Sequence, residues 1–259
     1  MEPEIWKYID ELAKRIKRII VIFIASLIAF LAIPSPNPFG IKGSSILFYD
    51  TLIFWIIRKM EEAYLPPESM LIVTSVTAPL FAILQMALYL SLAITIPVAF
   101  REIYAFISPA LYRREKAVIK KYLMPFSLLY IAGMIYTIII VLPLTFRALI
   151  FLYYPLNIAL FINLNDFINI VVLMVILGGL LFALPTFVLP LIEVGILSTR
   201  TLSKNRILLY LIIAFIAGLI SPDPTFLSVI PLLIPIYALY EGTIYFGRRI
   251  EKRNMQKFR

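Results

Sequence analysis

Residues 167–193 read F-I-N-I-V-V-L-M-V-I-L-G-G-L-L-F-A-L-P-T-F-V-L-P-L-I-E, and only the final glutamate of this stretch can ionise. A helix needs about 20 apolar residues to cross the roughly 30 Å hydrocarbon layer of a bilayer, because each residue advances it by about 1.5 Å. The stretch therefore predicts a membrane-spanning helix, and Pro185 and Pro190 predict a bend in it. It is too continuously apolar for the strands of a β-barrel, which alternate.

The rest of the chain shows the same pattern. Of its 259 residues 62% are hydrophobic, whereas a soluble domain is only about half apolar. We predict an all-α polytopic membrane protein, a single integral-membrane domain over residues 1–259, with six transmembrane helices at about 19–33, 71–100, 123–141, 167–193, 207–220 and 226–246. An amphipathic helix over about 4–18 is expected to lie at the membrane surface. Loops are expected over 34–70 (with a short helix at Leu47–Ala63), 101–122 and 144–166.

The positive charges predict the orientation. Twenty of the 24 lysines and arginines lie in the N-terminal segment, the loops after the second and fourth spans, and the C-terminal tail. Lys and Arg accumulate in cytoplasmic loops, so both termini are expected in the cytoplasm. The fifth span, 207–220, reaches only about 21 Å, so either the bilayer thins there or the helix does not cross it fully.

Several function classes are disfavoured by what the chain lacks. It has no histidine and no cysteine, which argues against a metal site, thiol chemistry and a Ser-His-Asp hydrolase. It also has no phosphate-binding loop of the G-x-x-x-x-G-K-[ST] type, so nucleotide hydrolysis is not expected. We therefore predict no catalytic residues and no cofactor. The net charge of +9 fits cytoplasmic loops better than nucleic-acid binding.

Two acids stand out. Glu11 lies on the polar face of the N-terminal helix near Lys7, Lys14 and Arg15, as an ordinary surface carboxylate would. Glu115 is expected on a helix that starts at Ser108-Pro109. Its neighbours on that helix are apolar or aromatic, at Leu111, Tyr112, Val118 and Ile119. Glu115 therefore needs a partner from outside its own helix, which is either a basic residue of this chain or a cationic ligand.

The remaining acids suggest structural roles. Glu193 and Glu241 lie near the cytoplasmic ends of spans 4 and 6, where they are expected to snorkel or cap. Asp223 lies in a proline-bounded external turn, where Asp is common. The deep parts of the spans hold almost no ionisable group, which argues against a proton relay or ion path.

Four motifs, in order along the chain, resemble those of one family. Residues 106–115, F-I-S-P-A-L-Y-R-R-E, closely resemble the F-x-x-P-x-L-Y-x-x-E signature of the TatC family, the multispanning core of the twin-arginine protein translocase. Residues 8–16, Y-I-D-E-L-A-K-R-I, resemble its H-L-x-E-L-R-x-R-L motif. Residues 220–224 and 234–241 (I-S-P-D-P and I-P-I-Y-A-L-Y-E) resemble its T-P-P-D and I-P-x-x-x-L-Y-E stretches, and L-P-P-E-S with T-A-P at 65–69 and 77–79 resembles the lead into the second span.

This resemblance implies a receptor for the twin-arginine signal peptides of folded cargo, in a translocase driven by the proton gradient across the cytoplasmic membrane. It implies that Glu11 and Glu115 bind the arginine pair, that Phe106 and Pro109 shape the binding patch, and that Arg15 orients Glu11. Carboxylates suit this task, because they accept charge-assisted, often bidentate hydrogen bonds from guanidinium. The implied partners are single-span TatA- or TatB-like subunits and further copies of the chain.

The chain departs from the family pattern at three positions. Tyr8 replaces the family histidine, and Ala13 replaces the first arginine of the E-L-R motif. Ala183 occupies the place where many relatives have a membrane-embedded Glu or Gln. Glu193 lies about 15 Å further along the helix, so it is no simple substitute. Ala183, Glu193, Asp223 and Glu241 are therefore candidates for structural or partner contacts.

Two other function classes each require features of their own. A small-solute or ion secondary transporter would need polar groups meeting at mid-membrane or broken helices around a site, and Pro185 and Pro190 could supply such a break. A membrane enzyme acting on lipid would need a catalytic set, which the available acids do not form.

Overall fold

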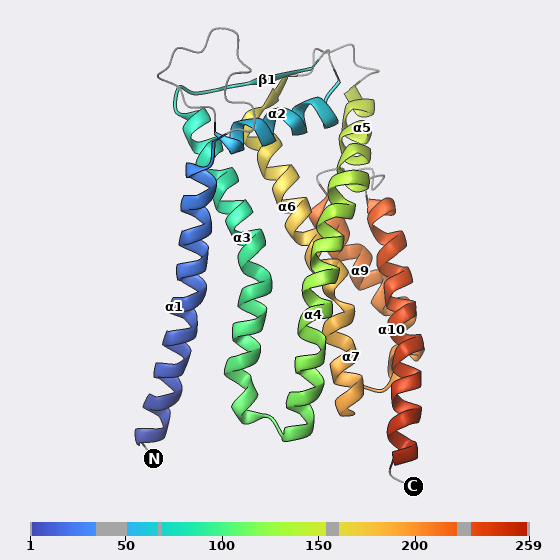
Figure 1. Ribbon diagram of the computed structural model, residues 1–259. Coiled ribbons are helices and arrows are strands. Elements are labelled where there is room, and N and C mark those ends of the chain that lie inside the picture. The colour runs from blue at the N-terminus through green and yellow to red at the C-terminus, as the bar shows by residue number, and fades with distance from the viewer. Residues whose placement is uncertain (1, 35–50, 67–68, 154–160, 222–228, 258–259) are drawn as a thin grey trace. The chain divides into compact units, whose positions relative to one another are not determined.

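The computed structural model describes residues 2–34, 51–66, 69–153, 161–221 and 229–257, which are mostly helical (Figure 1). Two compact units divide the chain, one of Met1–Glu102 with Leu149–Val172 and one of Ile103–Ala148 with Leu173–Arg259. Four helical segments within the described ranges are long and apolar enough to cross a membrane: Ala78–Ile107, Glu115–Phe151, Leu164–Val194 and Val229–Arg253. Arg206–Leu219 is a shorter apolar helix. The chain is thus a helical, multi-pass membrane protein.

The first unit begins with helix α1 (Glu2–Ala32), which corrects the predicted division at residue 18. The structure has one continuous helix in place of a surface helix followed by a span, because no proline or glycine interrupts the segment. Pro34 follows its end, and the backbone N–H of Leu52 bonds to the carbonyl of Ile33 at 3.0 Å. Helix α2 (Leu52–Tyr64) then begins beside the end of α1, which it contacts, and extends away from it (Figure 1).

The second predicted span starts later than expected. Residues Met70–Ile72 form strand β1, which pairs in parallel with β2 (Phe161–Asn163), and helix α3 runs over Ala78–Ile107. The predicted start at residue 71 is therefore wrong, since a segment with the polar residues Thr74, Ser75 and Thr77 separates the strand from the helix. Pro79 suits a first helical turn. Buried side chains of this unit include Ile53, Met86 and Phe167.

The third predicted span is much longer than expected. Helix α4 (Arg113–Tyr136) continues through the π-helical segment η2 (Thr137–Val141) into α5 (Leu142–Tyr153). The predicted loop over 144–166 is therefore wrong at both ends, because residues 144–153 are helical and residues 161–166 belong to strand β2 and to helix α6 (Leu164–Ala183). Pro143 has no N–H to donate, and the wider π turn just before it allows the helix to continue.

The fourth predicted span consists of two helices. Helix α6 (Leu164–Ala183) ends one residue before α7 (Pro185–Val194), so the bend predicted at Pro185 is confirmed as an interruption. The Thr186 hydroxyl donates to the carbonyl of Ala183 at 2.6 Å, which satisfies one of the freed backbone groups. Helix α7 runs through Pro190 without ending.

Helices α4, α7 and α10 (Val229–Lys257) pack together in the second unit (Figure 1). The rings of Phe126 and Phe187 meet edge to face at 5.4 Å, and the Tyr136 hydroxyl donates to the carbonyl of Pro231 at 2.8 Å. Helices α8 (Thr199–Lys204) and α9 (Arg206–Ile220) complete the unit. The fifth predicted span matches α9, whereas α10 continues eleven residues beyond the predicted end of the sixth.

Candidate functional site

The first group of predicted site residues lies on α1. Arg15 Nη2 donates to Glu11 Oε1 at 2.6 Å, and Arg15 Nε contacts the same oxygen at 3.2 Å. This is the contact expected from their spacing of one helical turn. The hydrogen bond to Glu11 raises the pKa of Arg15, so the guanidinium stays charged. The Glu11 side chain remains 34% exposed, so a second cation can reach it.

Glu102, which was not predicted from the sequence, joins this pair. Its side chain is only 8% exposed on α3, and it accepts hydrogen bonds from Arg15 Nη1 at 3.3 Å and Arg18 Nη1 at 2.9 Å. We call Glu11, Arg15, Arg18 and Glu102 the α1–α3 charge cluster. Two carboxylates balance two guanidinium groups in it, and Arg15 bridges both acids.

The sequence held a weak signal for this role of Glu102. Arg101 and Glu102 are the first charged residues after the long apolar run of α3. A carboxylate at the edge of an apolar region is stable only if a positive charge pairs with it. The segment just before the first apolar run carries five basic residues. Helical spacing could not select Arg15 and Arg18 among them, because the pairing joins residues more than eighty positions apart.

The turn between α3 and α4 differs from its prediction. Ser108–Ala110 form the short 3-10 helix η1, and the Leu111 N–H donates to the carbonyl of Ser108 at 3.3 Å. Leu111 and Tyr112 are both extended, so the helix that carries Glu115 begins at Arg113. The predicted helix start at Ser108-Pro109 is therefore wrong, because these residues close a single turn before the chain extends.

Glu115 is the third residue of α4, and its partner lies in the same turn. Its Oε2 accepts the backbone N–H of Tyr112 at 3.0 Å, which is half of a capping box. The expectation that Glu115 needs a partner from outside its helix is therefore wrong, since that helix starts four residues later than predicted. Nearby, the Tyr104 hydroxyl donates to the carbonyl of Lys116 at 2.7 Å and ties the end of α3 to α4.

Phe106 and Pro109 lie on the same turn as Glu115. Phe106 is half-buried near the end of α3, and Pro109 is exposed in η1. The structure therefore places the predicted site residues in two local groups. Glu11 and Arg15 lie in the α1–α3 charge cluster of the first unit, and Phe106, Pro109 and Glu115 lie on the α3–α4 turn of the second.

The other candidate acids join helices. Glu193 on α7 accepts from Lys121 Nζ at 3.1 Å and from the Tyr122 hydroxyl at 2.7 Å, both on α4. Glu241 on α10 accepts from the Tyr210 hydroxyl of α9 at 2.5 Å. The sequence predicted that these two acids snorkel or cap. In the structure each of them joins its own helix to a neighbouring helix.

Two predicted contact positions remain. Ala183 is completely buried, and Asp223 lies outside the described residues. Within the part of the chain that the structure describes, no group of three acidic, histidine or cysteine side chains could hold a metal ion.

The long apolar helices define a multi-pass membrane protein, and charged side chains cluster near the ends of these helices. In comparisons with known proteins, this chain is similar to components of protein translocases. A family model described as "Sec-independent protein translocase protein (TatC)" matches residues 7–235. The chain belongs to the TatC family.

Individual relatives agree with this assignment. The TatC protein of Aquifex aeolicus is 31% identical over 90% of this chain and 94% of its own length. That of Escherichia coli K12 is 28% identical over 90% of this chain and 84% of its own. A crystal structure of the twin-arginine translocase receptor TatC matches at 26% identity with a TM-score of 0.71, over 94% of this chain and 99% of that one.

The family assignment also distinguishes a translocase component from a transporter and from an enzyme. A TatC-family protein is a translocase component and not an enzyme. None of these relatives supports the small-solute or ion transporter.

Proposed function

We propose that this chain is the twin-arginine signal-peptide receptor and core component of a translocase that exports folded proteins across the cytoplasmic membrane, driven by the proton gradient. The observation that carries the proposal is the TatC-family match over residues 7–235, which includes Glu11 and the Phe106–Glu115 motif. The crystal structure named as a receptor, similar over nearly the whole chain, supports it.

In this proposal Glu115 binds an arginine of the signal peptide. An ionised carboxylate offers about four acceptor positions, and the bond to Tyr112 uses one of them. Capping α4 is therefore compatible with accepting hydrogen bonds from a guanidinium. The cap also holds the side chain in one orientation, which reduces the entropy lost on binding.

Glu11 is proposed to bind an arginine by exchange. A peptide guanidinium would displace Arg15 from Glu11, and Arg15 would keep its hydrogen bond to Glu102. Because Glu102 remains as a partner, the exchange leaves no charge of the cluster unpaired. Without that second acceptor, displacing Arg15 would be costly.

The test is binding of a twin-arginine signal peptide to the purified protein in nanodiscs, compared with a twin-lysine version. We expect tighter binding of the arginine peptide, because lysine cannot form the bidentate contact. Glu11→Gln and Glu115→Gln should each weaken it by about tenfold or more, as expected when a charge-assisted hydrogen bond is lost. Glu62→Gln is the matched control, because Glu62 is an exposed carboxylate already paired with Lys59.

A double-variant cycle tests whether the two acids act on one peptide. If Glu11 and Glu115 share the ligand, the loss in Glu11→Gln/Glu115→Gln will differ from the sum of the single losses, whereas independent sites give additive losses. Equal binding of both peptides to every variant would contradict the proposed role of these acids.

We further propose six spans, cytoplasmic termini, single-span TatA- or TatB-like partners and more than one copy in the assembled complex. The family assignment supports these statements, together with the 20 basic residues on the predicted cytoplasmic segments. Co-purification of a tagged and an untagged copy from one membrane extract tests the last of them, and recovery of the tagged copy alone would contradict it.

A further inference from the structure

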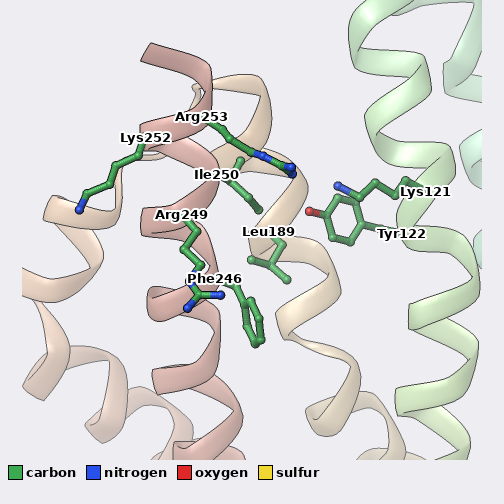
Figure 2. A pocket seen from close by; sticks show the side chains of 8 residues that line it. All are labelled: Lys121, Tyr122, Leu189, Phe246, Arg249, Ile250, Lys252 and Arg253. Atoms are coloured by element: carbon green, nitrogen blue, oxygen red, sulfur yellow. The ribbon is translucent and has the colours of Figure 1, made fainter. Parts of the chain in front are cut away.

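A basic cleft of about 730 Å³ lies in the second unit, and none of the residues that line it is proposed to bind the signal peptide. Its lining includes four cations, at Lys121, Arg249, Lys252 and Arg253, and the apolar side chains of Leu189 and Phe246. Figure 2 shows Lys121 and Arg253 reaching toward the same space from α4 and α10. The cleft therefore combines positive charge with an apolar wall.

The acids near the cleft do not cancel its charge. Glu193 is bonded to Lys121 and offsets that one cation. Glu251 accepts the backbone N–H of Thr199 at 2.7 Å and keeps its negative charge, so two acids stand against four cations. The Arg249 guanidinium lies 4.6 Å from the ring of Tyr245, a contact that leaves its charge in place. Arg249 thus adds to the net positive charge that Lys252 and Arg253 give the cleft, which suits an anion.

The cleft lies where two helices change from polar to apolar. On α4, Lys121 is the last basic residue before an uncharged run that extends to residue 146. On α10, the basic residues begin at Arg248, after a run from Val229 whose only charge is Glu241. Such a change in composition marks the membrane–water interface, where the phosphates of lipids lie.

An apolar cleft of about 540 Å³ continues from the basic one. The two share Leu189 and Phe246, and the apolar cleft extends along α10 past Gly242 to Pro235. Eleven residues of helix correspond to about 16 Å, close to the roughly 15 Å depth of one hydrocarbon leaflet. An apolar extension of this length fits an acyl chain, and a free phosphate ion would leave it empty.

We propose that these two clefts form a binding site for an anionic phospholipid. The phosphate-bearing headgroup would contact Arg249 and Arg253, while Lys252, which points to the other side of α10 in Figure 2, would add positive charge at the rim. An acyl chain would lie along Leu189, Phe246 and Gly242. Arginine and lysine supply the charge that separates an anionic lipid from a zwitterionic one. The site joins α4, α7 and α10 through a lipid, in addition to the Lys121–Glu193 bridge.

The test is native mass spectrometry of the full-length protein in neutral detergent, with phosphatidylglycerol and phosphatidylcholine of identical acyl chains. We expect the wild type to prefer phosphatidylglycerol by about tenfold or more, because each nearby cation contributes about fivefold. Arg249→Gln/Lys252→Gln/Arg253→Gln should bring the two lipids to equal binding. Equal binding by the wild type, or a preference that survives in this variant, would overturn the proposal.

The control removes the same charge elsewhere. Lys120→Gln/Arg200→Gln/Lys204→Gln alters three exposed residues that line neither cleft, so the lipid preference should persist. If this control variant also loses the preference for phosphatidylglycerol, the preference depends on the overall charge of the protein, and the proposed site is overturned.

A second variant tests the apolar part without changing charge. A Cβ at Gly242 would meet no atom within 4 Å, so Gly242→Leu fills the cleft without an initial clash. It should lower the binding of both lipids, and unchanged binding would overturn the placement of the acyl chain. Inorganic phosphate at millimolar concentration should not displace phosphatidylglycerol, and displacement would show a phosphate-ion site instead.

Discussion

At the scale of single residues, Arg15 shows how one side chain connects two acids. It lies 2.6 Å from Glu11, one turn away on α1, and 3.3 Å from Glu102 on α3. The contact with Glu11 follows from helical spacing, and the contact with Glu102 does not. Arg15 therefore holds Glu11 in place and at the same time ties α1 to α3.

Glu102→Gln should weaken this connection. The carboxylate is 8% exposed and accepts from two arginines, so we expect a loss of about 1–3 kcal/mol in the free energy of unfolding. Thermal unfolding in detergent measures it. Glu62→Gln breaks an ion pair whose two side chains are 55% exposed, and should change stability by less than about 1 kcal/mol. Equal effects of the two substitutions would show that Glu102 has no special structural role.

Two substitutions of Glu115 separate its role as a helix cap from its proposed role in binding the signal peptide. Glutamine can still accept the Tyr112 N–H, so Glu115→Gln should keep the stability of the protein and lower peptide affinity. Glu115→Ala loses the cap as well, at a cost of about 1 kcal/mol in unfolding free energy. Calorimetry of unfolding combined with peptide titration distinguishes the variants. Equal losses of stability in both would argue against capping by this side chain.

At the scale of helices, close approach depends on small residues. A Cβ built on Gly178 of α6 would lie 2.2 Å from Thr137 Oγ1, and one on Gly133 of α4 would lie 2.5 Å from Phe182 Cβ. The Thr137 hydroxyl donates to the carbonyl of Gly133 at 2.8 Å, so it cannot move without losing that bond. Such contacts are typical of helix packing inside membranes, where close backbone approach replaces the hydrophobic effect.

Gly178→Ala should therefore be destabilising by about 1–3 kcal/mol, as expected for overpacking. Gly242→Ala is the matched control on α10, because its new methyl group meets no atom within 4 Å. Melting temperatures of the two variants in the same detergent provide the measurement. A Gly178→Ala protein as stable as the wild type would mean that α4 and α6 can separate at little cost.

At the scale of helices, the sequence predicted which helices exist better than it predicted where each one begins and ends. The apolar runs correctly indicated α6, α9 and α10, and Pro185 indicated the interruption between α6 and α7. Hydropathy could not show that α4 runs on into α5, or that residues 70–72 pair with 161–163 as strands. Both depend on backbone partners, which composition does not specify.

For the whole molecule, the proposed topology can be tested without a cysteine-free variant, because the natural chain has no cysteine. Single cysteines at Lys14, Lys120, Lys204 and Lys252 should react with a membrane-impermeant maleimide only from the cytoplasmic side. Val76→Cys, at a position that is 97% exposed, should react only from the opposite side. Reaction of the Lys252 site from outside would imply an odd number of spans and contradict cytoplasmic termini.

The sequence by itself determined the membrane class, the order of the helices and the family, because these depend on local composition and on motifs read along the chain. It also placed Arg15 beside Glu11, since residues one helical turn apart are neighbours. Only the tertiary structure decided that Glu102 pairs with Arg15 and Arg18, and that Glu193 joins α7 to α4. These contacts join residues more than seventy positions apart, and the packing of helices, which no local pattern encodes, brings them together.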